Sequence, residues 1–375
     1  MKQYRVVIIG FAHMHINDVA SHFYENPRTE LVACADTVPA MPELRAAPYT
    51  RAWNKRFCMD NFKIPREYQD YQEMLDKEKP DIAIVTSENV LHREIVEQCA
   101  RRSVHVCVEK PMAVSLSDAL QMQRAAEQYG VKLLVNWPIT WLPVYRTLKQ
   151  KLDEGAIGRL IEFKIRTSHT GPLGAGAAHK GVNETAQPMT GQEKAHTWWH
   201  QLNRGGGAMY DFCCYGSMLS HWLADQEAQS AFGLRANLMS QFGDADDTAV
   251  MVVRFPNCVA LIETSWTTPK ELIPSNIPML YGTEGAMTLV NVDGRDAVKV
   301  LRPNQEDALF FTDEPAQKDR DIACAFVHHL DTGEEVHPTL SLKRNISAMR
   351  ILDAGVRSAG SGQQEMTASE YWQIG

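Results

Sequence analysis

The sequence predicts an α/β protein whose first half is a parallel sheet with helices on both faces. Short β-branched and apolar runs alternate there with helical stretches, which is the pattern of repeated β-α-β units. The runs are apolar throughout, as parallel strands buried on both faces require. The first run, residues 4–9, ends at Gly10, and the second, residues 31–35, ends at Asp36.

Three further strands are predicted at 81–86, 104–108 and 133–136, with helices between them at 92–102 and 117–129. Ser115 stands where it can cap the second of these helices. The carboxyl ends of such strands face one crevice, so residues at these ends should surround one ligand. They are Gly10, Asp36, Thr86, Asn89, His92, Lys110 and Asn136.

The turn after the first strand is an altered form of the dinucleotide-binding fingerprint G-x-G-x-x-G. The chain has Gly10-Phe11-Ala12-His13-Met14-His15. Ala12 still lets the backbone approach a pyrophosphate, whereas His15 must displace the helix or turn its ring toward the ligand. By itself the turn is equally typical of an ordinary strand-turn-helix. Asp36 stands where the acid binding a ribose 2′-hydroxyl is expected, and its charge favours NAD over NADP.

Several short motifs occur in a characteristic order along most of the chain. They lie at 10–15, 87–92, 109–111 (Glu-Lys-Pro), 155–158, 205–211 and 282–286. In this order they resemble the Gfo/Idh/MocA oxidoreductases, named for glucose-fructose oxidoreductase, inositol dehydrogenase and a rhizopine-catabolism protein. The resemblance implies a dinucleotide-binding domain over 1–136 and a substrate-binding and oligomerisation domain over 137–375. The second domain would contain a large open, mostly antiparallel sheet and a C-terminal helix able to pack back on the first.

The resemblance also implies that NAD is the cofactor. The cofactor site would be formed by the strand ends and turns of the first domain. Its predicted residues are Gly10, Phe11, Ala12, His13, His15, Asp36, Thr86, Ser87, Asn89, His92, Glu109, Lys110 and Asn136.

The second half contains strand-like runs at 160–166, 248–255 and 259–266, with Asn257 at a plausible hairpin turn. Alternating polar and apolar positions indicate a sheet with one face wet or at an interface. Together with the resemblance, this pattern predicts a homo-oligomer, a dimer or a tetramer.

Lys110, Asp211 and Tyr215 are the predicted catalytic residues. Asp211 and Tyr215 share one helical face after a triple glycine. The glucose-fructose oxidoreductase branch has tyrosine where many relatives have histidine, so the resemblance assigns Tyr215 a proton relay and Asp211 the orientation of a substrate hydroxyl. A nearby ammonium stabilises phenolate and burial lowers a lysine pKa, so we expect Lys110 and Tyr215 to tune one another. Which of the two takes the proton is left open.

Each catalytic prediction has a simpler alternative. Lys110 could form an ion pair with Glu109 at a strand end. Asp211 could cap its helix, which is compatible with a functional role. Tyr215 could be a core aromatic residue whose hydroxyl finds a partner.

The stretch 167–204 is long and rich in glycine, and such loops often cover sites. Its tryptophans could offer flat faces to a sugar ring, or could instead pack on the core or on a neighbouring subunit. Another irregular stretch, 39–65, could fold over the adenine side or the active site. The predicted substrate-binding residues are Trp137, His179, Lys180, His196, Trp198, Trp199 and Asp211.

Several histidines raise the question of a metal site. They are His13, His15, His92, His169, His179, His196 and His200. None forms a tight ligand pair in the sequence with an acid nearby, so we predict no metal.

The composition is that of a soluble globular protein: 375 residues with 44% hydrophobic and 22% charged residues. The net charge of -8 argues against binding to nucleic acid. No apolar stretch reaches the ~20 residues that span a bilayer, and the N-terminus runs straight into a strand, so we expect no membrane association and a cytoplasmic location. The 8 cysteines show no disulfide framework.

The sequence therefore predicts an NAD-dependent oxidoreductase that takes a hydride from a secondary hydroxyl of a small sugar, glycoside or cyclic polyol. The alternative is an NAD-dependent glycoside hydrolase that works by transient oxidation, elimination, water addition and re-reduction. A third hypothesis is a non-enzymatic dinucleotide sensor, against which the intact catalytic residues weigh.

Overall fold

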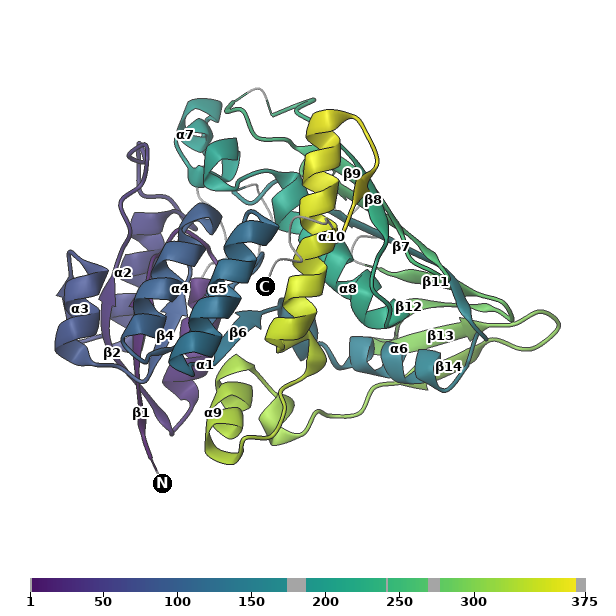
Figure 1. The fold of residues 1–375 in the computed structure, drawn as a ribbon, viewed down its shortest axis with the longest axis horizontal. Helices are drawn as coiled ribbons and strands as arrows, with labels where there is room; N and C mark the ends of the chain where they lie inside the picture. Colours follow the sequence, from purple (N-terminus) through teal and green to yellow (C-terminus); the bar gives the residue numbers. More distant parts are fainter. Residues whose placement is uncertain (1, 174–186, 241, 269–276, 369–375) are drawn as a thin grey trace.

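Two sheets with their own helices make up the chain, which the computed structural model describes over residues 2–173, 187–240, 242–268 and 277–368 (Figure 1). The predicted substrate residues His179 and Lys180 lie outside these ranges. Among the helices in these ranges, none is both long and apolar enough to cross a membrane.

The first sheet is parallel throughout and has the order β3-β2-β1-β4-β5-β6. The order reverses between β1 and β4, and in such sheets a ligand binds at the carboxyl edge near this point. The predicted Rossmann-type sheet is confirmed. Its strands are β1 (Tyr4–Ile9), β2 (Thr29–Ala35), β3 (Glu67–Tyr68), β4 (Ile82–Val85), β5 (His105–Glu109) and β6 (Leu133–Asn136).

Five helices belong to this sheet. The stretch 39–65, left unassigned from the sequence, contains one of them, and its first residue is Arg51. Ser115 caps another as predicted, because its hydroxyl accepts a hydrogen bond from the Asp118 N–H at 3.1 Å. The helices are α1 (Ile16–Glu25), α2 (Arg51–Phe62), α3 (Tyr71–Glu78), α4 (His92–Arg101) and α5 (Leu116–Tyr129).

The second sheet has nine strands in the order β14-β13-β12-β11-β7-β10-β9-β8-β15. Among its strands in the described ranges, only β7 and β10 pair in parallel, so the predicted, mostly antiparallel sheet is confirmed. The strands are β7 (Leu160–Ser168), β8 (Ser230–Ala236), β9 (Thr248–Arg254), β10 (Val259–Ser265), β11 (Met279–Gly282), β12 (Ala286–Val292), β13 (Arg295–Leu301), β14 (Ala308–Phe311) and β15 (Glu365–Met366).

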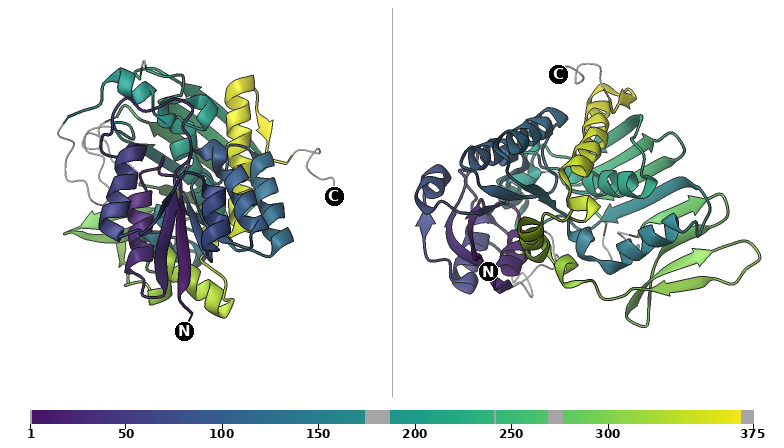
Figure 2. Two further views of the ribbon diagram at one scale, coloured as in Figure 1. Left: turned by 90° about the vertical axis from the view of Figure 1, so that its left-hand side faces the viewer. Right: turned by 60° about the horizontal axis from the view of Figure 1, so that its bottom comes forward.

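The two faces of this sheet differ. Buried and exposed residues alternate along β9, as expected for a sheet covered on one side. The covering helices are α6 (Pro143–Asp153), α8 (Cys214–Ala224) and α10 (Leu342–Ser361), and they lie on the face turned toward the first sheet (Figures 1 and 2). The opposite face points away from these helices.

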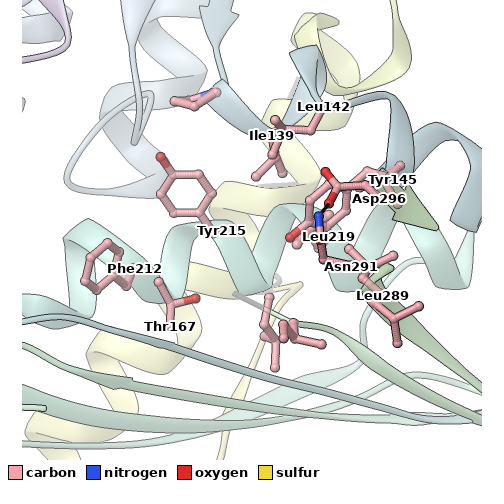
Figure 3. Close-up of a pocket in the computed structure, with 15 residues that line it drawn as sticks. Ile139, Leu142, Tyr145, Thr167, Phe212, Tyr215, Leu219, Leu289, Asn291 and Asp296 are labelled. Atoms are coloured by element: carbon pink, nitrogen blue, oxygen red, sulfur yellow. Dashed lines mark hydrogen bonds between the residues drawn. The ribbon is translucent and has the colours of Figure 1, made fainter. Parts of the chain in front are cut away.

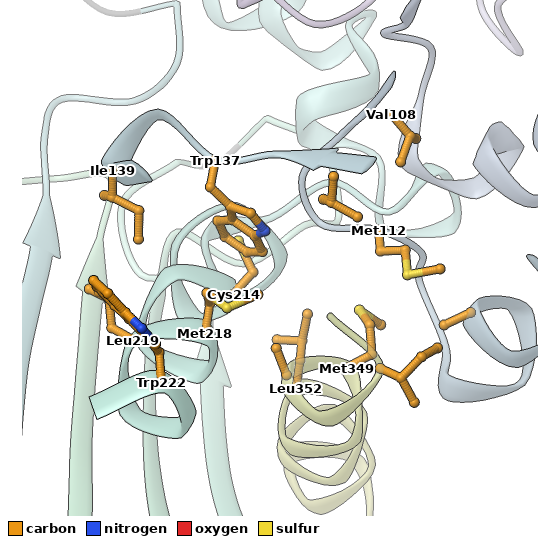
Figure 4. Close-up of a cluster of buried hydrophobic side chains, with 14 of the residues drawn as sticks. Val108, Met112, Trp137, Ile139, Cys214, Met218, Leu219, Trp222, Met349 and Leu352 are labelled. Atoms are coloured by element: carbon orange, nitrogen blue, oxygen red, sulfur yellow. The ribbon is translucent and has the colours of Figure 1, made fainter. Parts of the chain in front are cut away.

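The C-terminal part of the chain returns to the first domain. The helix α9 (Ile322–Thr332) packs beside α1, where the Tyr4 hydroxyl donates to Asp331 Oδ1 at 2.9 Å. Met349 and Leu352 of α10 join Met112 and Trp137 in one apolar cluster that continues from the first sheet to the second (Figure 4). The carboxyl edge of the first sheet is therefore set against the second domain through a shared core.

Candidate active site

Lys110, directly after β5, forms a buried ion pair across the two domains. Its side chain is 1% exposed, and Nζ lies 2.6 Å from Asp211 Oδ1. The same amine donates to the Asp211 carbonyl oxygen at 3.0 Å. Trp266 Nε1 donates to the other carboxylate oxygen, Oδ2, at 3.1 Å. Both oxygens of Asp211 are thus hydrogen-bonded, and its position is fixed from two sides.

This pair is held in its charged form. Burial by itself lowers the Lys110 pKa, but the Asp211 carboxylate and then Tyr215 raise it, and the net shift is upward. Burial likewise raises the Asp211 pKa, whereas Lys110 lowers it, and the net shift is downward. The expectation that burial would leave Lys110 with a lowered pKa is wrong, because the sequence did not show an aspartate at hydrogen-bond distance.

Tyr215, the second residue of α8, presents its ring face to the amine. Lys110 Nζ lies 4.8 Å from the ring centroid, which is a cation–π contact. Burial raises the pKa of the Tyr215 phenol, and the opposing effect of Lys110 is smaller. The expectation of a phenolate favoured by the ammonium is therefore wrong, and Tyr215 is a neutral phenol. The structure brings Lys110, Asp211 and Tyr215 together, and their roles stay predictions.

Trp137 packs against the ring of Tyr215. Its indole is buried and meets the Tyr215 ring edge-on, with 5.4 Å between the centroids. Its Nε1 donates to Asn345 Oδ1 of α10 at 2.8 Å. This placement makes Trp137 a packing residue behind Tyr215, whereas the sequence predicted that it contacts substrate.

The altered fingerprint packs tightly on the end of β4. Gly10 has a φ of 84°, and a Cβ there would lie 2.7 Å from the Ser87 backbone, so only glycine fits. The Thr86 hydroxyl donates to the Gly10 carbonyl at 2.7 Å, and the His13 N–H donates to the Thr86 carbonyl at 3.0 Å. Thr86 and Ser87 thus shape this turn.

His15 turns its ring into the crevice, which was one of the two outcomes expected for it. Its Nδ1 lies 2.9 Å from Glu109 Oε1, and Asn136 Nδ2 donates to Glu109 Oε2 at 3.2 Å. Burial alone raises the Glu109 pKa, but His15 and then Lys110 bring it below the usual value. A charged carboxylate therefore lies next to Lys110 on the first-domain side.

His13, His15 and Glu109 each offer a ligand atom, and these atoms lie within 4.8 Å of one another. A metal ion could be held here. No local motif indicates this cluster, because His15 and Glu109 are 94 positions apart. The absence of a metal stays a prediction.

Asp36 is held by three donors on one oxygen. Its Oδ1 accepts from the N–H groups of Phe11 at 3.1 Å and Thr37 at 2.8 Å, and from Arg51 at 2.7 Å. The other amino group of Arg51 donates to the buried Glu88 at 2.5 Å. Within the described ranges nothing donates to Asp36 Oδ2, which is the acceptor a ribose hydroxyl needs. The crevice therefore fits a dinucleotide.

Asn89 and His92, predicted to contact the cofactor, are buried between neighbouring segments. Asn89 Nδ2 donates to the Gly205 carbonyl at 2.8 Å and joins the two domains. His92 Nδ1 lies 3.2 Å from the carbonyl oxygens of Pro111 and Met112, and burial lowers its pKa. A neutral His92 can thus donate to the segment that follows Lys110 and hold it in place.

The tryptophans of the long loop pack on the fingerprint turn, which is the alternative considered for them from the sequence. Both are buried, and Trp198 Nε1 donates to the Ala12 carbonyl at 2.8 Å. The Trp199 ring lies 4.7 Å from that of His13, edge-on. His196 Nδ1 lies 3.2 Å from the Pro42 carbonyl. These three predicted substrate residues therefore face loops of the first domain.

His169, considered from the sequence as a metal ligand and, among the histidines of the stretch 167–204, as a base for elimination, lies beside the catalytic pair. It follows β7, and its charge contributes to lowering the Asp211 pKa. Its ring meets Phe212 edge-on at 4.7 Å, and its Nδ1 accepts from the Gly171 N–H at 2.8 Å. No local motif connects His169 with Asp211, so only the fold shows this proximity.

Asp246 supports the π-helical turn Met209–Cys213 that carries Asp211. Its Oδ2 accepts from the Met209 N–H at 2.8 Å. Gly207 has a φ of 106°, and a Cβ there would lie 2.5 Å from Asp246 Oδ1. Burial raises the Asp246 pKa to about 6, while the Met209 N–H and Arg235 oppose the shift.

Beside Tyr215 a cavity of about 380 Å³ extends between α6, α8 and the second sheet (Figure 3). Phe212, Tyr215 and Thr167 border one end, and Asn291 and Asp296 border the other. Tyr215 therefore borders this cavity and also contacts the Lys110 amine.

Two family models match the sequence. Residues 4–137 match the oxidoreductase family, NAD-binding Rossmann fold, and residues 145–288 match the GFO/IDH/MocA C-terminal domain. The chain belongs to the Gfo/Idh/MocA oxidoreductase family. The resemblance drawn from the motifs is thereby confirmed, and the first sheet of this family member is an NAD-binding domain.

Curated relatives match parts of this Gfo/Idh/MocA chain. It is 24% identical over 251 residues to 2,7-anhydro-N-acetylneuraminate hydratase of Mediterraneibacter gnavus, which is 64% of the chain and 61% of the relative. It is 36% identical over 97 residues to D-apiose dehydrogenase of Paraburkholderia graminis, which is 26% of each. The matches thus span less than two thirds of either relative.

Solved structures share the whole fold. Aldose-aldose oxidoreductase from Caulobacter crescentus, solved with glycerol, has a TM-score of 0.73 and 18% identity over 97% of this chain and 100% of that one. An oxidoreductase from Agrobacterium radiobacter, solved with NAD+, L-tartaric acid and magnesium, has a TM-score of 0.73 and 17% identity, and the match covers 98% of this chain and 99% of that one.

The Asp246 pKa predicts a pH-dependent stability. Its pKa is about 6 in the fold, against 3.8 for an exposed aspartate. Between these values the folded state holds a proton that the unfolded state has lost, so ionisation destabilises the fold as pH rises from about 4 to about 6. The shift corresponds to about 3 kcal/mol. Denaturant unfolding at pH 4 and above pH 6 measures this. The free energy of unfolding of wild type should fall by this amount relative to that of Asp246→Asn as the pH rises. A difference that is constant with pH would contradict it.

The contact between Arg51 and Asp36 indicates how the preference for NAD over NADP can be changed. Asp36→Ser removes the acid and frees Arg51 to pair with a 2′-phosphate, so affinity for NADP relative to NAD should rise at least about tenfold. Fluorescence titration with both cofactors measures the ratio. The double variant Asp36→Ser/Arg51→Ala is the control, and it should lose the gain for NADP. An equal gain in both variants would show that Arg51 is not responsible.

Proposed function

We propose that the protein is an NAD-dependent oxidoreductase that takes a hydride from a secondary hydroxyl of a sugar, glycoside or cyclic polyol. The observation that carries this proposal is the buried Lys110–Asp211 pair at the carboxyl edge of an NAD-binding sheet. Bound NAD supplies the hydride acceptor.

Lys110 binds and polarises the substrate hydroxyl. Asp211 accepts two of the three ammonium hydrogens through its Oδ1 and its carbonyl, which leaves one for the substrate oxygen. As the hydride leaves the carbinol carbon, the hydroxyl proton passes to Lys110 Nζ, and Lys110 gives one of its protons to Asp211 Oδ1. Lys110 thus ends charged and Asp211 ends neutral. Tyr215, a neutral phenol, holds the amine under its ring face and orients the substrate.

Lys110→Ala should lower kcat by roughly 10²- to 10⁴-fold, the usual contribution of a positioned acid–base group. The NAD dissociation constant should change little, because Asp36 and the fingerprint turn are untouched. Steady-state kinetics and NAD titration measure the two. The double variant Lys110→Met/Asp211→Asn controls for the buried charge that the single variant leaves unpaired. Turnover close to wild type in either variant would refute the role given to the amine.

A second candidate is an NAD-dependent glycoside hydrolase that oxidises, eliminates, adds water and re-reduces. The position of His169 beside Asp211 and Phe212 favours it, because elimination needs a further group near the sugar ring. A similar relative is named a hydratase.

Aryl glycosides separate these functions when NADH absorbance and aglycone release are followed together. Net NADH indicates the dehydrogenase that we propose, and aglycone without net NADH indicates the hydrolase. NAD binding with neither signal, for any sugar tested, would leave the dinucleotide sensor.

We further propose that the protein is a homo-oligomer, a dimer or tetramer, formed through the outer face of the second sheet. Leu234 on that face is 58% exposed and pairs across the strands with the exposed Val250. Phe232 and Val252 form the next exposed pair. Apolar side chains gathered in this way favour an interface. A cytoplasmic location is supported by the 8 cysteines, which are all buried and free.

Leu234→Glu combined with Val252→Glu should place like charges in this interface and shift the protein to monomers. Light scattering coupled to size exclusion measures the mass. Val38→Glu adds a charge at an exposed position of the first domain and should leave the mass unchanged. An unchanged oligomer in the double variant, or a monomeric wild type, would contradict this assembly.

A further inference from the structure

The cavity beside Tyr215 is lined mainly by apolar side chains. Its volume of about 380 Å³ lies within the range of about 300–1,000 Å³ typical of small-molecule sites. Leu142, Ile165, Leu219 and Leu289 form its walls. Figure 3 shows Leu142, Leu219 and Leu289 reaching into it from the segment before α6, from α8 and from β12.

Parts of these walls are left in water. Leu142 is 46% exposed and Ile277 is 37% exposed, and both line the cavity. At the far end Asn291 Nδ2 donates to Asp296 Oδ1 at 2.8 Å. The other polar side chains in the lining are Thr167, Tyr145 and Tyr215. A sugar ring placed between the aliphatic walls would lose water from its hydroxyls and find few partners there, which is unfavourable. An apolar ring would gain from the same burial.

The end of the cavity that Phe212 and Tyr215 border is aromatic and adjoins the predicted catalytic residues. Phe212 and Tyr215 line it, with 6.4 Å between their ring centroids. Tyr215 also touches the Lys110 amine. A sugar whose hydroxyl lies at Lys110 is therefore next to Tyr215, and a substituent that extends past Tyr215 would enter the cavity.

We propose that this cavity binds an aryl aglycone, so that the substrate is an aryl glycoside rather than a free sugar. The inference rests on the proposed function, because that function places the sugar at Lys110. The aromatic end of the cavity offers edge and face contacts that an aryl ring uses and an alkyl group does not. Binding of the aglycone requires no covalent step, and it serves oxidation and oxidative hydrolysis alike.

Matched methyl and phenyl glycosides of each common hexose test the proposal on the NAD-loaded protein. We expect kcat/KM for the phenyl glycoside to exceed that for the methyl glycoside roughly ten- to hundredfold, mainly through KM. Leu142→Asp places a charge on an already exposed wall position and should lower this ratio at least about tenfold. Leu309→Asp changes a leucine with 43% exposure that does not line the cavity, and the ratio should stay as in wild type.

Binding distinguishes failure of this inference from failure of the proposed function. If no glycoside is turned over, the proposed function fails, and saturation-transfer NMR then tests the cavity alone. Saturation of the phenyl protons that Leu142→Asp abolishes and Leu309→Asp preserves supports the aryl site. A kcat/KM ratio near one in wild type, a ratio unaffected by Leu142→Asp, or phenyl saturation equal in both variants would overturn it.

Discussion

The buried ion pair between Lys110 and Asp211 is the contact on which the arrangement of the site depends. It joins the residue after β5 of the NAD-binding sheet to the π-helical turn of the second domain, with 2.6 Å between Nζ and Oδ1. Breaking a buried pair by removing one partner leaves an uncompensated charge and typically costs about 3–5 kcal/mol. The pair therefore fixes both the relative position of the domains at this point and the protonation state of the amine.

Each partner of the pair is held in place by hydrogen bonds among its neighbouring residues. On the first-domain side, His92 can donate to the carbonyls that follow Lys110, and Asn89 bonds to Gly205 across the domain boundary. On the second-domain side, Asp246 holds the N-terminal end of the turn, and Trp266 bonds to Asp211 itself. Because these contacts come from several strands and helices, the Lys110 amine is held in one position before a substrate binds.

Features that depend on a local sequence pattern were predicted correctly. Apolar runs and turn residues located the parallel strands, the position of Asp36 and the strand end at Lys110, because these follow from side-chain periodicity. Contacts between distant segments could not be predicted. The bridge from Arg51 to Asp36 and Glu88 needs the start of α2 to lie at the ends of β2 and β4, and the contact of His15 with Glu109 needs the parallel sheet to form.

The pKa values show the same limit. Burial of Lys110 was expected, but its sign of shift depends on a carboxylate 101 positions away. Trp137 follows a strand end as a ligand residue would, and only the return of α10 shows that its indole bonds to Asn345 inside the core. Chemistry-bearing residues are visible in a sequence, whereas their partners, which decide their role, depend on the tertiary fold.

In the proposed function, a charged Lys110 paired with Asp211 binds the reacting hydroxyl beside the nicotinamide. A crystal structure with NADH and a non-oxidisable deoxy or fluoro analogue of a turned-over substrate tests it most directly. We expect the ion pair to be intact and the substituent that replaces the hydroxyl to lie next to Lys110 Nζ, between the nicotinamide and Tyr215. An amine turned away from Asp211, or a nicotinamide ring remote from Lys110, would contradict it.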